Sequence, residues 1–202
     1  MKLFLLTCLA ITTIAITSYA QNLTPISVGS SIPMRDVKMK DVSGKEVSLK
    51  DAMGKNGLLV MFSCNTCPYV IKNQERTKQI CDYAKANGLG VVVINSNEDK
   101  RNDDDSYDAM KKYAADQGYA WSYVVDTDSK LANAFGATKT PETFLFNADG
   151  KLTYHGAIDD NPSEAENVSR QHLKEAINEM NAGKEVSVKE SKSVGCTIKR
   201  KS

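Results

Sequence analysis

The stretch Gly57-Leu58-Leu59-Val60-Met61-Phe62-Ser63-Cys64-Asn65-Thr66-Cys67-Pro68 decides the fold. Its first six residues form a short apolar run, which is typical of a strand that is buried on both faces of a sheet. Two cysteines separated by two residues follow at once. Pro68 then favours the first turn of a helix, where its missing N–H costs no hydrogen bond. A buried strand, a Cys-x-x-Cys motif and a proline-led helix therefore follow one another directly.

This order predicts thiol–disulfide chemistry at Cys64 and Cys67. Two cysteines three positions apart at a helix start lie about one turn apart, so they can close a disulfide without moving the backbone. We expect Cys64 to lie at the N-terminal end of the helix, where unpaired amides and the helix dipole favour a thiolate. Because the thiolate is the attacking species in exchange, Cys64 is the expected attacking thiol.

A zinc site and a purely structural disulfide are weaker alternatives for the motif. Half of a zinc site would need a second Cys-x-x-Cys or a pair of histidines, and only His155 and His172 are present, one on a predicted strand and one on a predicted helix. A purely structural disulfide does not require the buried strand that immediately precedes the motif. We therefore expect redox chemistry, with neither a metal ion nor a cofactor.

The rest of the chain alternates strands and helices. A small hairpin is predicted over residues 36–48, around Ser43-Gly44, and one helix runs from Pro68 to a stop at Gly88. Further strands, helices and a hairpin over residues 142–157 follow, with a last helix that stops at Gly183. This order predicts an α/β fold whose central sheet is covered on both faces.

The charged run Glu98–Asp105 lies between the second predicted strand and the next helix. We interpret it as a solvated loop, since charge runs of this kind usually cover a surface. The alternative, a loop that binds a divalent metal ion, lacks the spacing of an EF-hand.

Composition and the N-terminal residues indicate export. The chain has 202 residues with a formal net charge of +1, so neither nucleic acid nor an anionic membrane surface is an expected partner. Lys2, the apolar stretch Leu3–Ile16 and the small residues of Ser18-Tyr19-Ala20 are typical of a cleaved signal peptide. The apolar stretch is too short to span a bilayer. We expect a signal peptide at 1–20, a folded domain at 21–183 and a polar C-terminal tail with one cysteine at 184–202.

The motifs resemble the thioredoxin superfamily. Phe62–Pro68 after a strand, with Thr140-Pro141 before a later strand, is similar to the superfamily pattern. This resemblance implies an α/β thioredoxin fold with a central mixed sheet, helices on both faces and an N-terminal β-hairpin extension. It also implies that Thr140–Pro141 is cis and packs against Cys64. The closer resemblance is to the peroxiredoxin-like (AhpC/TSA, redoxin) branch that carries a Cys-x-x-Cys motif, and it rests on Cys67–Val70, Gly156–Pro162 and Val194–Lys199.

Three departures from related patterns affect the expected chemistry. Ser63 stands where thioredoxins have tryptophan, and Leu58 stands where they have the buried aspartate that assists proton transfer. We therefore consider Glu142, beside Pro141, as a substitute proton acceptor. Peroxiredoxins read P-x-x-x-T/S-x-x-C up to their reactive cysteine, and with Cys67 in that role neither Val60 nor Cys64 matches.

The two remaining cysteines of the mature chain have different settings. Cys81 lies 14 residues beyond Cys67 on the predicted helix, roughly 21 Å away, so it is expected to be a buried free thiol. Cys196 lies in a flexible-looking tail. It is either an accidental surface cysteine, a structural partner of Cys81, or a resolving thiol on a tail that folds back over the active site.

The expected function is exchange of disulfides with protein thiols by an exported oxidoreductase in the periplasm or outside the cell. Its partners are protein thiols and disulfides, together with an upstream redox partner, and we expect no stable membrane insertion after signal cleavage. Peroxide reduction by a peroxiredoxin-like enzyme is the main alternative. A copper-handling protein similar to the Sco chaperones is a further one, although those proteins use Cys-x-x-x-Cys and a distal histidine.

Overall fold

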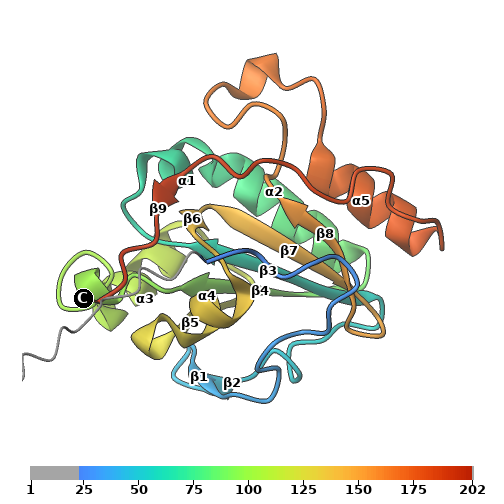
Figure 1. The fold of residues 1–202 in the computed structure, drawn as a ribbon. Coiled ribbons are helices and arrows are strands. Elements are labelled where there is room, and N and C mark those ends of the chain that lie inside the picture. The colour runs from blue at the N-terminus through green and yellow to red at the C-terminus, as the bar shows by residue number, and fades with distance from the viewer. Residues whose placement is uncertain (1–22, 202) are drawn as a thin grey trace, which may run out of the picture.

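A five-stranded mixed sheet forms the centre of the computed structural model, which describes residues 23–201 (Figure 1). The strands lie in the order β5-β4-β3-β7-β8. Strands β3, β4 and β5 are parallel, whereas β7 is antiparallel to both β3 and β8. This mixed sheet confirms the expected fold class. The bounds of these strands are β3 (Gly57–Ser63), β4 (Leu89–Asn95), β5 (Ser122–Val125), β7 (Glu142–Asn147) and β8 (Leu152–Gly156).

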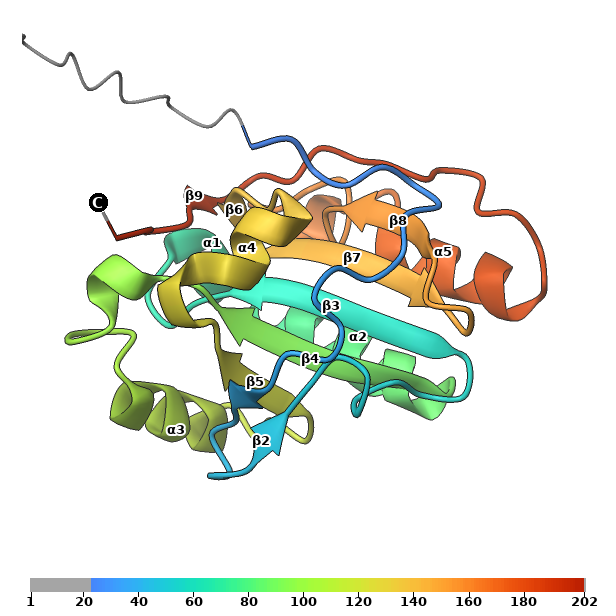
Figure 2. The same ribbon diagram turned by 60° about the horizontal axis from the view of Figure 1, so that its bottom comes forward.

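Helices cover both faces of the sheet. They are α1 (Pro68–Lys72), α2 (Gln74–Ala86), α3 (Tyr107–Asp116), α4 (Lys130–Phe135) and α5 (His172–Asn181), with short 3-10 turns at η1 (Glu98–Lys100), η2 (Thr127–Ser129) and η3 (Ala165–Asn167). Figure 2 shows α4 and the N-terminal segment in front of the sheet, with α2 and α5 behind it.

The central strand β3 is completely buried because it supplies side chains to two hydrophobic clusters. Side chains alternate along a strand, so Leu59 and Met61 join the cluster with α2 and α5, while Phe62 and its alternate neighbours join the cluster with α4. The Phe62 ring makes edge-to-face contacts with Phe135 and Phe144, at centroid separations of 5.3 and 5.7 Å. This packing fixes the end of β3, which leads into the two cysteines.

The N-terminal hairpin is present as predicted. Strand β1 (Met39–Lys40) pairs antiparallel with β2 (Glu46–Val47) around a turn that contains Gly44 in the left-handed region, with φ of 86°. The expected signal peptide at 1–20 lies outside the described residues. Within residues 23–201, no helix is sufficiently long and apolar to cross a membrane.

The single helix expected from Pro68 to Gly88 is instead two helices, because the chain departs from helical geometry at Asn73. Asn73 has φ −96° and ψ 5°, and its side-chain amide donates to the carbonyls of Tyr69, at 2.7 Å, and Pro162, at 2.8 Å. Side chains of this type compete with helical hydrogen bonds. The short helix α1 is thus separated from α2 and tied to the loop that follows β8.

Residues 184–201, here called the strap, lie along the edge of the molecule. The strap first pairs with β8, through His155 N–H to Lys189 C=O and Ser191 N–H to His155 C=O. Its last strand, β9 (Cys196–Thr197), then pairs antiparallel with β6 (Lys139–Thr140) (Figure 1). Val186 and Ile198 are buried in the two hydrophobic clusters. The expectation of a flexible tail is therefore wrong, because backbone pairing and two apolar anchors hold it.

Candidate active site

The two cysteines of the motif lie between the end of β3 and the start of α1. Strand β3 ends at Ser63, and α1 begins at Pro68 with Cys67 as its N-cap residue. The prediction that Cys64 lies at the N-terminal end of the helix is therefore wrong. The geometric reason is that Pro68 fixes the first helical position, so the favourable field of the free helical amides acts on Cys67.

Both cysteines lie against Thr140, the residue before the cis-proline. The Thr140–Pro141 bond is cis, as the family resemblance implied. The Cys64 Sγ is 3.5 Å from the Thr140 Oγ1, and the Cys67 thiol donates to the Thr140 carbonyl at 3.3 Å. Both thiols are buried, with exposed fractions of 2% for Cys64 and 5% for Cys67. Thr140 therefore contacts both sulfur atoms from one side of the motif.

The pKa values of the two thiols are shifted in opposite directions. The pKa of Cys67 is lowered to about 4, chiefly because the Cys64 thiol donates a hydrogen bond to its thiolate, with smaller contributions from the thiol of Cys196 and the amide of Val70. The pKa of Cys64 is raised, first by that same hydrogen bond, then by burial, and further by the negative charge of Asp105. The surroundings of the pair therefore favour the thiolate at Cys67 and the protonated thiol at Cys64.

Cys196 is the third cysteine of this cluster. Its residue is the register partner of Thr140 in the β6–β9 pair, and it packs against the group formed by Cys64, Cys67 and Val70. Its pKa is raised, first by burial and then by the hydrogen bond that its thiol donates to Cys67. Cys196 is half-buried and is the most accessible of the three thiols. It is thus neither a surface cysteine nor a partner of Cys81.

Sequence reasoning missed the importance of Asp105. This residue is fully buried, and its carboxylate accepts hydrogen bonds from the amide N–H of Asn65 at 2.9 Å, from the side chain of Asn95 at 2.7 Å and from that of Asn97 at 2.9 Å. Asn65 lies between the two cysteines. Asp105 therefore both fixes the loop of the motif and places a negative charge near Cys64.

The charged run Glu98–Asp105 is consequently not a solvated loop throughout. Arg101 is directed inward, where it donates to the carbonyls of Asn95, at 2.8 Å, and Asp105, at 2.6 Å, and pairs with Glu98 at 2.8 Å. The signal in the sequence was Asn95-Ser96-Asn97 directly after a buried strand. Amide side chains at that position can donate hydrogen bonds to a buried carboxylate, so a residue of the charged run can be buried beside them.

Glu142 lies beside Pro141 as expected, but its carboxylate has other partners. One oxygen accepts the N–H groups of Thr138 and Lys139, both at 2.8 Å, and the other pairs with His155 Nε2 at 2.7 Å. Glu142 is 2% exposed. These contacts hold the turn that carries Thr140, so the structure gives Glu142 a positioning task at the cis-proline.

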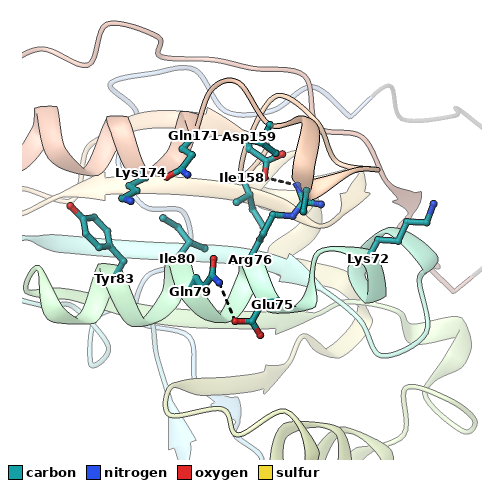
Figure 3. Close-up of a pocket in the computed structure, with 12 residues that line it drawn as sticks. Lys72, Glu75, Arg76, Gln79, Ile80, Tyr83, Ile158, Asp159, Gln171 and Lys174 are labelled. Atoms are coloured by element: carbon teal, nitrogen blue, oxygen red, sulfur yellow. Dashed lines mark hydrogen bonds and ion pairs between the residues drawn. The ribbon is translucent and has the colours of Figure 1, made fainter.

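Cys81 lies apart from the thiol cluster, fully buried on α2 in the core and unbridged, as predicted. A pocket of about 350 Å³ also lies apart from it, between α2 and α5 (Figure 3). Arg76 crosses one end of this pocket and pairs with Asp159 at 2.6 Å. The same guanidinium donates to the carbonyls of Asn161 and Pro162, so it fixes the loop Gly156–Pro162 next to α1.

A mixed sheet, a helix that starts at a Cys-x-x-Cys motif and a cis-proline in contact with both thiols define the thioredoxin-like oxidoreductases. The Redoxin profile matches residues 27–170, and the chain belongs to this family. The structure is similar to that of an uncharacterized conserved protein from Geobacillus kaustophilus, with a TM-score of 0.80 and 31% identity over 87% of this chain and 93% of that one.

Two other proteins are similar to the chain. A hypothetical protein from Sinorhizobium meliloti 1021 has a similar structure, with a TM-score of 0.78 and 30% identity over 89% of this chain and 97% of that one. The thiol-disulfide oxidoreductase ResA of Geobacillus thermodenitrificans is 27% identical over 129 residues, which cover 64% of this chain and 68% of that protein.

Proposed function

We propose that this protein is an exported thiol–disulfide oxidoreductase that exchanges disulfides with protein thiols through Cys64 and Cys67. The observation that carries the proposal is the position of Cys67 at the N-cap of α1, with Thr140 in contact with the sulfur atoms of both Cys64 and Cys67. Similarity to ResA, a thiol-disulfide oxidoreductase, supports the same class. Export is supported by the signal-peptide pattern of residues 1–20.

We propose Cys67, rather than Cys64, as the attacking thiol, because Cys67 is the N-cap residue of α1 and its pKa is lowered. The Cys67 thiolate attacks a substrate disulfide, forms a mixed disulfide and releases one substrate thiolate. Cys64 then loses its proton and attacks the Cys67 Sγ, which closes the Cys64–Cys67 disulfide and releases the second substrate thiolate. Two electrons pass from the enzyme to the substrate, and a dithiol partner returns them. The reverse sequence oxidises substrate thiols, and the reduction potential of the pair sets the direction.

The direct test is reduction of a protein disulfide such as that of insulin, with dithiothreitol as electron donor. We expect turnover by the wild type and by the control Cys81→Ala, whose thiol lies in the core, and none by Cys67→Ala. The double variant Cys64→Ala/Cys196→Ala should stop at a mixed disulfide on Cys67, because both neighbouring thiols are gone. Absence of turnover by the wild type would overturn the proposal.

Two further assays separate the alternatives. Consumption of hydrogen peroxide faster than disulfide reduction would favour a peroxidase, and stoichiometric binding of Cu(I) by the reduced protein would favour a copper-handling role. We expect neither. The peroxidase pattern is absent at Val60 and Cys64, and the copper alternative requires a different cysteine spacing.

A further inference from the structure

Three thiols meet around one residue. Thr140 contacts Cys64 through its hydroxyl at 3.5 Å and Cys67 through its carbonyl at 3.3 Å. On the neighbouring strand, Cys196 is the register partner of Thr140, and its side chain packs against Cys64 and Cys67. Figure 1 shows β9 beside β6 at the end of the sheet where α1 begins. The cluster therefore contains one thiol more than a Cys-x-x-Cys site needs.

Contacts of the strap hold Cys196 beside Thr140. A side chain at Gly195 would place its Cβ 2.1 Å from the Thr140 carbonyl oxygen, so only glycine permits this close approach. Beyond Cys196, the Lys199 N–H donates to Asn97 Oδ1 at 2.8 Å, and the Lys199 carbonyl accepts from the Asp99 N–H at 2.9 Å. The segment that carries Cys196 is thus fixed on both sides of the cysteine.

We propose that Cys196 is a third redox-active thiol, which takes over the disulfide from the buried Cys64–Cys67 pair and presents it to a dithiol protein that reduces the enzyme. The inference rests on the proposed function, because it needs a disulfide formed at the motif. Cys196 is suited to this role because it packs against the cluster of Cys64, Cys67 and Val70 and is more accessible than either cysteine of the motif.

The first step is an internal exchange. Cys196 gives up its proton, and its thiolate attacks the Cys67 Sγ. The Cys67–Cys196 bond forms, the Cys64–Cys67 bond breaks, and Cys64 leaves as a thiolate that takes up a proton. The step changes which sulfurs are joined without changing the number of electrons, so it requires no oxidant or reductant.

In the second step, the dithiol partner reduces the Cys67–Cys196 disulfide with two electrons. A thiolate of the dithiol protein attacks the Cys196 Sγ, and Cys67 leaves as a thiolate. The second thiol of the partner then attacks the partner's first sulfur, which is bonded to Cys196, and Cys196 leaves as a thiolate. The partner is now oxidised and the enzyme is fully reduced. A thiol of low pKa leaves faster. The environment that lowers the pKa of Cys67 thus favours attack at Cys196.

Disulfide mapping tests the first step. Cleavage after lysine separates the five cysteines into four peptides, with Cys8 in 3–38, Cys64 and Cys67 in 56–72, Cys81 in 79–85 and Cys196 in 193–199. Full-length Cys64→Ala, treated with glutathione disulfide, should join peptide 56–72 to peptide 193–199. Wild-type protein with one equivalent of oxidant should contain this cross-link together with the disulfide within 56–72. Glutathione on Cys67 with Cys196 free in Cys64→Ala, or a wild-type disulfide confined to peptide 56–72, would overturn the proposal.

The rate at which the oxidised enzyme is reduced tests the second step. With reduced thioredoxin as the protein dithiol and no insulin present, the oxidised form of Cys196→Ala should be reduced about tenfold more slowly than the oxidised wild type and than oxidised Cys81→Ala. Equal rates for Cys196→Ala and the wild type would overturn the role of Cys196 while leaving the proposed function intact. Failure of the wild type itself to reduce insulin would instead count against the proposed function.

Discussion

The amide N–H of Asn65 donates a hydrogen bond to Oδ1 of Asp105 at 2.9 Å, which joins the loop between the two reactive cysteines to the charged segment after β4. The side chain of Asn65 adds two bonds, one to the Asp104 carbonyl at 2.7 Å and one from the Tyr123 hydroxyl at 2.8 Å. A loop residue that is held by three hydrogen bonds has little freedom. Residues that are distant in sequence therefore hold the loop that separates Cys64 from Cys67.

Replacement of Asp105 should alter Cys64 specifically. The pKa of Cys64 is raised first by its hydrogen bond to Cys67 and by burial, and Asp105 adds its negative charge. We expect Asp105→Asn to lower this pKa and to cost about 2 kcal/mol of unfolding free energy, since the new amide faces donors. Alkylation of Cys64 as a function of pH measures the shift. Asp104→Asn, with an exposed side chain, is the matched control, and an unchanged Cys64 profile in Asp105→Asn would contradict the assignment.

The Cys67 thiolate should persist far below neutral pH. Because the pKa of Cys67 is lowered to about 4, the thiolate absorbance of the reduced protein should remain constant as the pH falls from 8 to 6 and disappear around pH 4. The associated stabilisation of the fold is present above the pKa of cysteine in the unfolded chain, about 8.5, and is lost as the pH falls through the folded value.

The same titration can rank the donors to Cys67. The thiol of Cys64 is the largest cause of the lowered pKa, and the thiol of Cys196 is a smaller one. Cys64→Ala should therefore raise the Cys67 pKa more than Cys196→Ala does. Thiolate absorbance in each reduced variant gives the comparison. The reverse order would show that the charge is shared differently from the arrangement described here.

Gly195→Ala should move the strap away from the active site. The added Cβ would lie 2.1 Å from the Thr140 carbonyl oxygen, so β9 cannot keep its register. We expect faster alkylation of Cys64 and Cys67 and a smaller yield of the Cys67–Cys196 cross-link. Gly183→Ala is the control, because its Cβ meets nothing within 4 Å and only the positive φ of 68° is strained. Equal effects of the two substitutions would refute a specific contact at Gly195.

Glu142→Gln separates a positioning role from proton transfer. The carboxylate accepts two backbone N–H groups and pairs with His155, so the substitution should cost about 1–2 kcal/mol of unfolding free energy. We expect the pH dependence of insulin reduction to retain its shape, because Glu142 acts through the turn at Thr140. A changed profile in a folded variant would restore Glu142 as the proton acceptor of the sequence-based hypothesis.

The fold, and the position of the cis-proline beside Cys64 and Cys67, could be predicted from the sequence. Apolar runs such as Leu58–Phe62 identify buried strands because strand periodicity is local, and the same holds for the hairpin at Gly44. The cis-proline beside the cysteines followed from the family resemblance. Cys81 was assigned to the core from its helical face.

The errors arose where distant segments determine local structure. The break at Asn73 depends on the Pro162 carbonyl, which lies 89 residues away in the chain. The burial of Asp105 depends on amides from β4 and from the motif itself. The position of Cys67 as N-cap, in contrast, could have been predicted from the sequence, because Pro68 already indicates the first helical turn. Local patterns do not report such long-range partners.

The way in which the strap is held has an evolutionary consequence. Backbone groups make its pairing with His155 and with β6, and such pairing accepts almost any side chain. Selection should therefore act most strongly on a few positions, namely Gly195, where the chains approach closely, Cys196, which carries the thiol, and the buried residues Val186 and Ile198. An exposed neighbour such as Lys192 is free to vary. Among related chains, a glycine–cysteine pair at this point should outlast the sequence around it.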